Sequence, residues 1–175
     1  MSASKKSSLR GGGNADKLSK HPDWSFALRQ DHPAFKTARK ANVEFLRSMT
    51  IGLTLNICCG ADPTGHVKAD IDEELLRHLK KTRLDDSEYV VCDVMHPPFR
   101  NWSFDTVICD PPFKFYNKFK WIQKLADIAR KRLILSVPPI NIGLNEKVWS
   151  RELYYTDSTG IFLRLWWVFT KREIE

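Results

Sequence analysis

The chain has 175 residues, the length of one ordinary domain, and 42% of them are hydrophobic, which is enough to build one sizeable core. A second folded domain is therefore not expected, and the formal charge of +7 favours an anionic partner such as nucleic acid. The start, MSASKKSSLRGGG, lacks the apolar run of a secretory signal, and the most apolar stretch, IFLRLWWVF, is too short to span a bilayer. We therefore expect a cytoplasmic protein with no membrane partner.

The first 20 residues differ in composition from the rest of the chain. They are rich in Ser, Lys and Gly, and five basic side chains stand against a single acid, Asp16. Such a segment buries too little apolar surface to fold, so we expect residues 1–20 to be a flexible basic tail. Residues 21–175 are then expected to form a single domain.

Residues 31–50 are predicted to form an amphipathic helix. Asp31 can cap this helix, Pro33 suits its first turn, and apolar residues follow at helical spacing. The other face carries basic side chains that are candidates for nucleic-acid contacts: Lys36, Arg39 and Lys40. This face is either a solvated cover of a sheet or a surface for a phosphate backbone.

Residues 51–175 alternate between short apolar runs and amphipathic segments. The runs are, in order, LTLNICC, HVKADI, the helical EELLRHLKK, YVVCDV, FDTVICD, a helix around 116–130, and RLILSV. This order predicts an α/β fold with a mostly parallel sheet and helices on its faces. The last run, ELYYTDSTGIFLRLWWVF, consists of two β-rich halves about a polar turn and predicts an antiparallel hairpin at the sheet edge.

The four cysteines give no sign of a cross-link or a metal site. Neither a CxxC pair nor the His spacing of a zinc site occurs among them, since they stand at Cys58, Cys59, Cys92 and Cys109. We therefore expect no disulfide framework and no metal. All four fall near the ends of predicted strands, which would bring them to one edge of the sheet.

Polar residues and a glycine follow the predicted strands at the places where ligands bind in an open α/β sheet. Gly60 allows a sharp turn, Asp70 can accept the two hydroxyls of a ribose, and Asp93 can accept from an adenine amino group. The GxGxxG fingerprint is absent, which argues against NAD. Taken singly, each aspartate is more often a capping or turn residue.

The segment Asp110-Pro111-Pro112-Phe113 follows the run FDTVIC directly. It can simply end a strand and reverse the chain. Alternatively, the Asp110 carboxylate and the Pro111 carbonyl accept hydrogen bonds from an amine conjugated to a base, whose lone pair is otherwise delocalised into the ring. Phe113 would then stack on a base taken out of its helix.

These segments together resemble the class I S-adenosylmethionine-dependent methyltransferases over roughly residues 50–137. The resemblance implies a three-layer Rossmann-like fold with a seven-stranded sheet, and S-adenosyl-L-methionine as cofactor. It assigns catalysis to the motif Asp110, Pro111, Pro112 and Phe113, and cofactor binding to Asn56, Cys58, Cys59, Gly60, Asp70, Ile71, Asp93, Val94 and Asp110. The loop after Gly60 is short, so the first helix of this family is expected to be shortened or missing.

The motif implies methylation of an exocyclic amino group of a nucleic-acid base in DNA or RNA, most often adenine, with Lys114 and Lys118 as further candidate contacts. Methylation of a glutamine amide in a protein stays open, because related enzymes use an Asn-Pro-Pro-Tyr form of the motif. A non-catalytic module that binds nucleic acid or supports a partner is the third alternative. No segment has room for a large target-recognition region, so a second copy or a partner subunit would supply target recognition.

Overall fold

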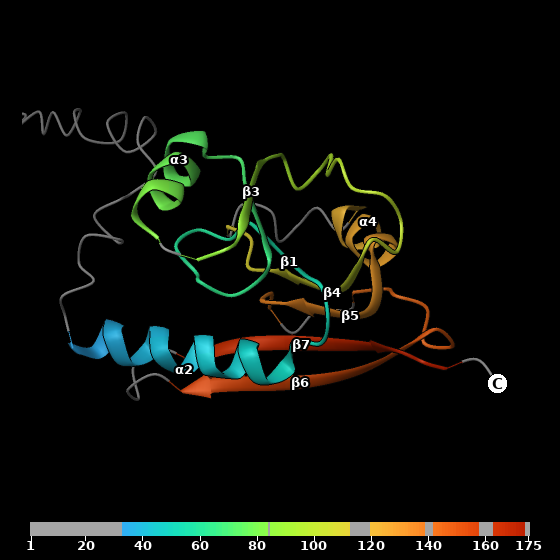
Figure 1. Ribbon diagram of the computed structural model, residues 1–175. Helices are drawn as coiled ribbons and strands as arrows, with labels where there is room; N and C mark the ends of the chain where they lie inside the picture. Colours follow the sequence, from blue (N-terminus) through green and yellow to red (C-terminus); the bar gives the residue numbers. More distant parts are fainter. Residues whose placement is uncertain (1–32, 84, 113–119, 139–141, 158–162, 174–175) are drawn as a thin grey trace, which may run out of the picture.

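The computed structural model describes residues 33–83, 85–112, 120–138, 142–157 and 163–173, with the backbone alone for 33–39, 157 and 163 (Figure 1). The predicted tail, residues 1–20, lies outside this range. The described elements are, in chain order, α2 (Pro33–Met49), β1 (Thr54–Ile57), β2 (Val67–Asp70), α3 (Glu73–Thr82), β3 (Glu88–Val91), β4 (Phe104–Cys109), α4 (Lys120–Ile128), β5 (Ala129–Leu135), β6 (Trp149–Asp157) and β7 (Leu163–Lys171).

One seven-stranded sheet joins all the strands in the order β3-β2-β1-β4-β5-β7-β6. The strands from β3 to β5 are parallel to one another, whereas β7 runs antiparallel to both β5 and β6. The predicted fold class is confirmed, including the hairpin at the sheet edge. None of the helices in the described ranges has the length and apolar character needed to cross a bilayer.

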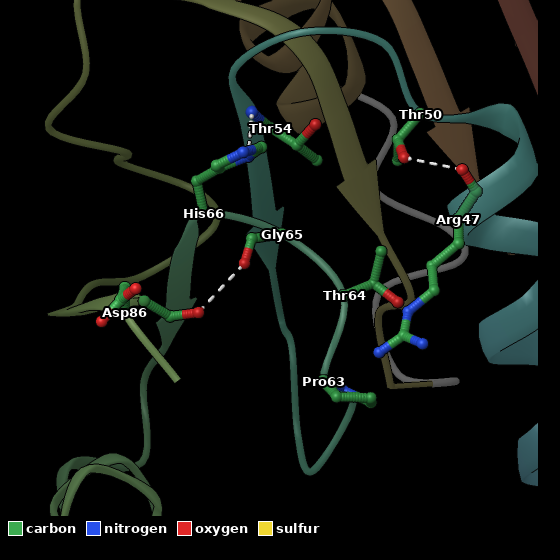
Figure 2. Close-up of a pocket in the computed structure, with 9 residues that line it drawn as sticks. Arg47, Thr50, Thr54, Pro63, Thr64, Gly65, His66 and Asp86 are labelled. Atoms are coloured by element: carbon green, nitrogen blue, oxygen red, sulfur yellow. Dashed lines mark hydrogen bonds between the residues drawn. The ribbon is translucent and has the colours of Figure 1, made fainter. Parts of the chain in front are cut away.

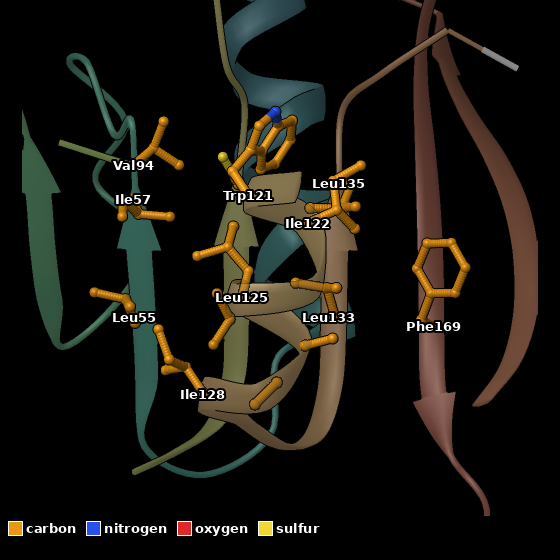
Figure 3. Close-up of a cluster of buried hydrophobic side chains, with 14 of the residues drawn as sticks. Leu55, Ile57, Val94, Trp121, Ile122, Leu125, Ile128, Leu133, Leu135 and Phe169 are labelled. Carbon is orange, nitrogen blue, oxygen red and sulfur yellow. The ribbon is translucent and has the colours of Figure 1, made fainter. Parts of the chain in front are cut away.

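The main core lies between α4 and one face of the sheet (Figure 3). On α4, Trp121, Ile122 and Leu125 are buried, and they pack over strand residues such as Leu133 on β5. The predicted helix around 116–130 extends too far at its end. Ala129 already pairs with Phe104 as the first residue of β5, because the chain passes from helix to strand without a loop. Residues 116–119 lie outside the described residues.

Helix α2 covers the opposite face of the sheet beside the hairpin (Figure 1). Leu46 is buried there against Ile108, Ile134, Trp166 and Val168. Phe45 adds aromatic contacts, with its ring centroid 5.5 Å from that of Tyr154 and 5.9 Å from that of Trp166. The amphipathic helix predicted for residues 31–50 is therefore present, and its apolar side covers the sheet.

The same face is polar over β1, where residues 58–66 form a loop without a helix, whereas α3 covers β2 and β3. Lys68 on β2 is fully buried on this face. Lys68 Nζ lies 2.6 Å from Asp85 Oδ2. The Asn56 side chain donates to the Thr64 carbonyl over 3.1 Å, so it fastens the loop to the sheet. Hydrogen bonds and one ion pair therefore add to the apolar packing of α3 in this region.

Candidate functional site

The chain turns sharply where it leaves β1. Cys58 and Gly60 both have positive φ values, 55° and 49°. The Gly60 N–H donates to Asp70 Oδ2 over 3.0 Å, and the Asp72 N–H donates to Asp70 Oδ1 over 3.1 Å. Asp70 therefore ties the turn after β1 to the chain that enters α3. Each of its oxygens keeps a lone pair free for a ligand.

The turn at Gly60 leaves room for a bound molecule. Apart from Gly60 and its two chain neighbours, no atom of the described residues lies within 4 Å of the position that a Cβ at Gly60 would take. Ile71, the residue after Asp70, is an exposed apolar side chain, with 69% of its surface accessible. An open backbone turn, a carboxylate and an apolar side chain therefore meet at the carboxyl ends of β1 and β2.

Asp93 follows β3 at the same edge of the sheet. Its Oδ1 accepts from the Met95 N–H over 2.9 Å, and its side chain is 41% exposed. The Cys92 N–H donates to the Asp70 carbonyl over 2.9 Å, which places Asp93 beside the end of β2. Its neighbour Val94 is buried in the main core, and Figure 3 shows it near Ile57 at the end of β1.

Asp110 stands directly after β4 and is held by two side chains. Oδ2 accepts a hydrogen bond from Arg164 in an ion pair, and the Ser136 hydroxyl donates to the same carboxyl group. Because β7 runs antiparallel to β5, Arg164 near its start lies at the carboxyl edge of the parallel strands. Burial raises the pKa of Asp110 above its usual range, while Arg164 and Ser136 oppose that shift.

The cysteines gather at this edge, as expected. The Cys58 and Cys109 thiols are within hydrogen-bonding reach of each other. Burial is the first cause of a raised pKa for Cys59, Cys92 and Cys109, and that of Cys92 rises to about 11. Thiols of this kind are poor nucleophiles at neutral pH. Within the described ranges, no group of three or more His, Cys, Asp or Glu side chains could hold a metal ion.

The structure thus brings Gly60, Asp70, Asp93 and Asp110 to one edge of the sheet. The Asn56 side chain donates to the loop after β1, and Cys59 packs with α3. Pro111 is buried and Pro112 is exposed, while Phe113, Lys114 and Lys118 lie outside the described residues. Lys40 is exposed on α2 and lies 3.7 Å from Glu44, whereas the side chains of Lys36 and Arg39 are not described.

Sequence reasoning missed Arg164 and Ser136 as parts of this site. The only signal for Arg164 was a charge inside the apolar run IFLRLWWVF, where a buried strand would not normally place one. Ser136 immediately follows β5 and therefore occupies the same kind of strand-end position as Asp110. A search of every residue that follows a parallel strand would have included it.

No family model matches the chain, and no curated protein matches its sequence. Solved structures do match its fold. One, from Methanococcus maripaludis, has been assigned as an S-adenosyl-L-methionine-dependent methyltransferase; it is 12% identical with a TM-score of 0.61, over 86% of this chain and 93% of that one. An rRNA methylase from Streptococcus thermophilus is 14% identical with a TM-score of 0.54. The match covers 75% of this chain and 95% of that one.

A third structure comes from a Haloferax volcanii complex between the Trm112 methyltransferase activator and a methyltransferase. It is 15% identical with a TM-score of 0.59, over 86% of this chain and 96% of that one. At these identities the likeness establishes the fold. The chain has the Rossmann-like fold seen in methyltransferases.

Proposed function

We propose that this chain transfers a methyl group from S-adenosyl-L-methionine to the exocyclic amino nitrogen of a nucleic-acid base, most often adenine. The observation that carries the proposal is the placement of the Asp110 carboxylate. It follows β4 at the same sheet edge as the Gly60 turn and Asp70, and Arg164 and Ser136 hold it in position. The shared fold supports the choice of cofactor.

The turn after β1 suits this cofactor. The open space at Gly60 admits a ligand close to the backbone, and the free lone pairs of Asp70 would accept the ribose hydroxyls. Exposed Ile71 offers an apolar contact to the adenine ring, and Asp93 offers an acceptor for its amino group. S-adenosyl-L-methionine would supply a methyl group on a positively charged sulfur, which keeps the electron pair when the carbon–sulfur bond breaks.

Asp110 would orient the target amine. An amine conjugated to a base has its lone pair in the ring, so acceptors must hold its hydrogens and turn the lone pair toward the methyl carbon. Arg164 occupies Oδ2, and the carboxylate keeps further lone pairs for the amine. The nitrogen forms the new bond with its own lone pair and then loses one proton, to Asp110 or through it to water.

The basic character of the chain supports a nucleic-acid substrate. The formal charge is +7, and exposed Lys40 lies on the solvent side of α2. We include Lys36, Arg39, Lys114 and Lys118 among the proposed contacts to the phosphate backbone. Target recognition would come from a second copy or a partner subunit, and the Haloferax volcanii complex offers a precedent for a partner on this fold.

One experiment tests the proposal directly. The purified full chain is incubated with labelled S-adenosyl-L-methionine and unmodified DNA, RNA or protein, and nucleosides and peptides are analysed by mass spectrometry. We expect label on the amino nitrogen of a base, and roughly 10²–10³-fold slower labelling with Asp110→Asn as the matched control. Label on glutamine instead would overturn the substrate class. A chain that binds the cofactor but labels none of the pools would contradict an enzymatic role.

A further inference from the structure

A pocket of about 300 Å³ lies away from the candidate site, beside the loop that replaces the missing helix (Figure 2). Its walls come from the end of α2, the start of β1, the loop before β2 and the chain entering β3. Thr54, which lines it, begins β1, whereas the Gly60 turn follows the end of that strand. The pocket therefore lies toward the opposite end of β1 from the candidate site.

Three side chains give this pocket a set of hydrogen-bond donors. The Arg47 guanidinium lines it and forms no ion pair or hydrogen bond with any described residue. In Figure 2, Thr64 lies beside the Arg47 side chain. His66, the residue before β2, also lines the pocket, and its Nδ1 accepts from the Thr54 N–H over 3.1 Å. The hydrogen of the neutral imidazole is then at Nε2, which can donate to a ligand.

Thr64 is the most informative of the three. Its residue is only 4% exposed, yet Oγ1 has no hydrogen-bond partner within the described part of the chain. The backbone around it is fixed, because its N–H donates to Asp62 Oδ1 over 2.7 Å and its carbonyl accepts from Asn56. Buried hydroxyls are almost always paired in folded proteins. A fixed, unpaired hydroxyl that lines a pocket indicates that a ligand completes its hydrogen bonding.

The charges around the pocket narrow the choice of ligand. Arg47 gives the pocket a positive charge, and Asp86 lines the pocket from the chain that enters β3. The hydroxyl groups of Thr50, Thr54 and Ser87 already donate to backbone carbonyls, so they add no free donor. One guanidinium and two neutral donors suit an oxyanion with a single negative charge. A phosphodiester carries one charge, whereas a free phosphate would set a second charge against Asp86.

A second basic residue on α2 could contact the same strand of nucleic acid as Arg47. Lys40 precedes Arg47 by seven residues, which is two helical turns and roughly 10 Å at about 1.5 Å per residue. Both side chains are exposed, so they lie on one face of the helix. Neighbouring phosphates of a duplex strand are about 3.4 Å apart along the axis, so this spacing spans about three of them.

We propose that the Arg47, Thr64 and His66 pocket binds a phosphodiester group of a nucleic-acid strand. The inference rests on the proposed nucleic-acid substrate and adds a place where its backbone is held. Binding does not require cofactor or methyl transfer. The two proposals can therefore be tested separately. If the chain binds nucleic acid through this pocket but does not methylate it, the proposed reaction is wrong and the proposed pocket is not.

The test measures the affinity of the full chain for fluorescent single-stranded DNA and RNA 12-mers at several salt concentrations, without cofactor. The variants are Arg47→Gln, which removes the positive charge, and Thr64→Val, which keeps the side-chain size and removes the hydroxyl group. The control is Arg77→Gln, which removes an exposed helix arginine that pairs with Glu73 outside the pocket. A parallel competition uses inorganic phosphate alone.

We expect Arg47→Gln to lower affinity about 10-fold and to reduce the salt slope by about one, with little effect of Arg77→Gln. Thr64→Val should lower affinity roughly threefold or more without lowering the unfolding temperature. Equal losses with Arg47→Gln and Arg77→Gln would overturn the proposal, because only general charge would then matter. So would an unchanged affinity for Thr64→Val, or variants that alter phosphate binding and leave 12-mer binding intact.

Discussion

Arg164 on β7 and Asp110 after β4 are 54 positions apart in the sequence, and their side chains form an ion pair at the carboxyl edge of the sheet. β5 separates the two strands in the sheet. The Arg164 guanidinium also lies 5.9 Å from the centroid of the Trp166 ring. The hairpin therefore supplies a cation to the carboxylate that we assign to the target amine.

The first prediction concerns the pH dependence of that carboxylate. Arg164 lowers the pKa of Asp110 against the effect of burial, so Arg164→Gln should raise this pKa further. The reaction needs the ionised carboxylate, and its activity falls as pH drops through that pKa. We therefore expect the acid side of the kcat profile to move to higher pH in Arg164→Gln.

The matched control is Arg151→Gln on β6, whose arginine lies 3.2 Å from Glu146 and is in register with Phe169, toward the opposite end of β7 from Arg164. Its kcat profile should coincide with that of the parent. An unchanged acid side in Arg164→Gln would mean that the ion pair does not tune Asp110.

The second prediction separates catalysis at Asp110 from stability. Asp110→Asn should lower kcat by roughly 10²–10³ and leave cofactor affinity nearly unchanged, because the carboxylate acts on the amine during attack. The pKa of Asp110 is raised, so the folded state favours the protonated carboxyl group. The stability that the protonated group contributes is present below the unfolded pKa and is lost as pH rises through the folded pKa. Near neutral pH, Asp110→Asn should therefore be most stable relative to the parent, because the amide carries no buried charge. Thermal unfolding at pH 4 and pH 7 measures this difference, and a loss of stability at pH 7 would favour a purely structural turn.

The third prediction concerns the turn after β1. Asp70 accepts hydrogen bonds from the N–H groups of Gly60 and Asp72, so Asp70→Ala should weaken both the fold and cofactor binding. The loss of hydrogen bonds to a charged acceptor should weaken cofactor binding by about 1.5–3 kcal/mol. Calorimetry with S-adenosyl-L-methionine measures the binding, and thermal unfolding measures the fold. A variant that unfolds more easily yet binds the cofactor as tightly as the parent would remove the ribose assignment.

The fourth prediction concerns Phe113, which lies outside the described residues. If its ring stacks on an extruded base, Phe113→Ala should weaken substrate binding by ~1–3 kcal/mol, whereas Phe113→Tyr keeps a stacking face and most of the activity. Binding to a 12-mer that contains the target base and turnover on it are the two measurements. Equal behaviour of the Ala and Tyr variants would contradict a stacking role.

Most of the fold follows from the sequence because hydrophobic periodicity and chain order are local signals. The helix Glu73–Thr82 shows this, with acids in its first turn and lysines in its last. The positions of Gly60, Asp70, Asp93 and Asp110 could also be found from the sequence, since each lies at or shortly after the carboxyl end of a parallel strand. Their meeting at one edge is a consequence of the parallel topology alone.

The remaining parts depend on register and on contacts between distant segments, which no local pattern encodes. Arg164 reaches Asp110 only because β7 is antiparallel and its start lies at the carboxyl edge. The resemblance assigns Asn56 to the cofactor, and only the structure shows that its side chain donates to the Thr64 carbonyl in the loop after β1. The buried Lys68 could not be foreseen, because lysine is almost never fully buried without a partner and its partner, Asp85, lies 17 positions away.

The fifth prediction concerns the ion pair of Lys68 and Asp85. Lys68 is fully buried, whereas the Asp85 side chain is 35% exposed. Asp85→Asn leaves a buried ammonium group without a counter-charge. Breaking a fully buried ion pair typically costs about 3–5 kcal/mol of stability. Because Asp85 is partly exposed, we take this range as an upper bound on the loss. Lys68→Met fills the same space without a charge and should cost much less. The double variant Lys68→Met/Asp85→Asn should therefore be more stable than Asp85→Asn alone, as measured by urea unfolding of all four proteins.

The same pair predicts an acid-sensitive part of the stability. Partial burial raises the pKa of Asp85, but hydrogen bonds from Lys68 and Ser87 outweigh it and bring the pKa down to about 2. A depressed pKa contributes stability that is present above the unfolded value near 4 and is lost as pH falls toward 2. We expect the parent to lose stability over this interval and Lys68→Met to lose less. If urea unfolding shows the same acid dependence in both proteins, the pair does not provide this stability and other carboxyl groups must account for it.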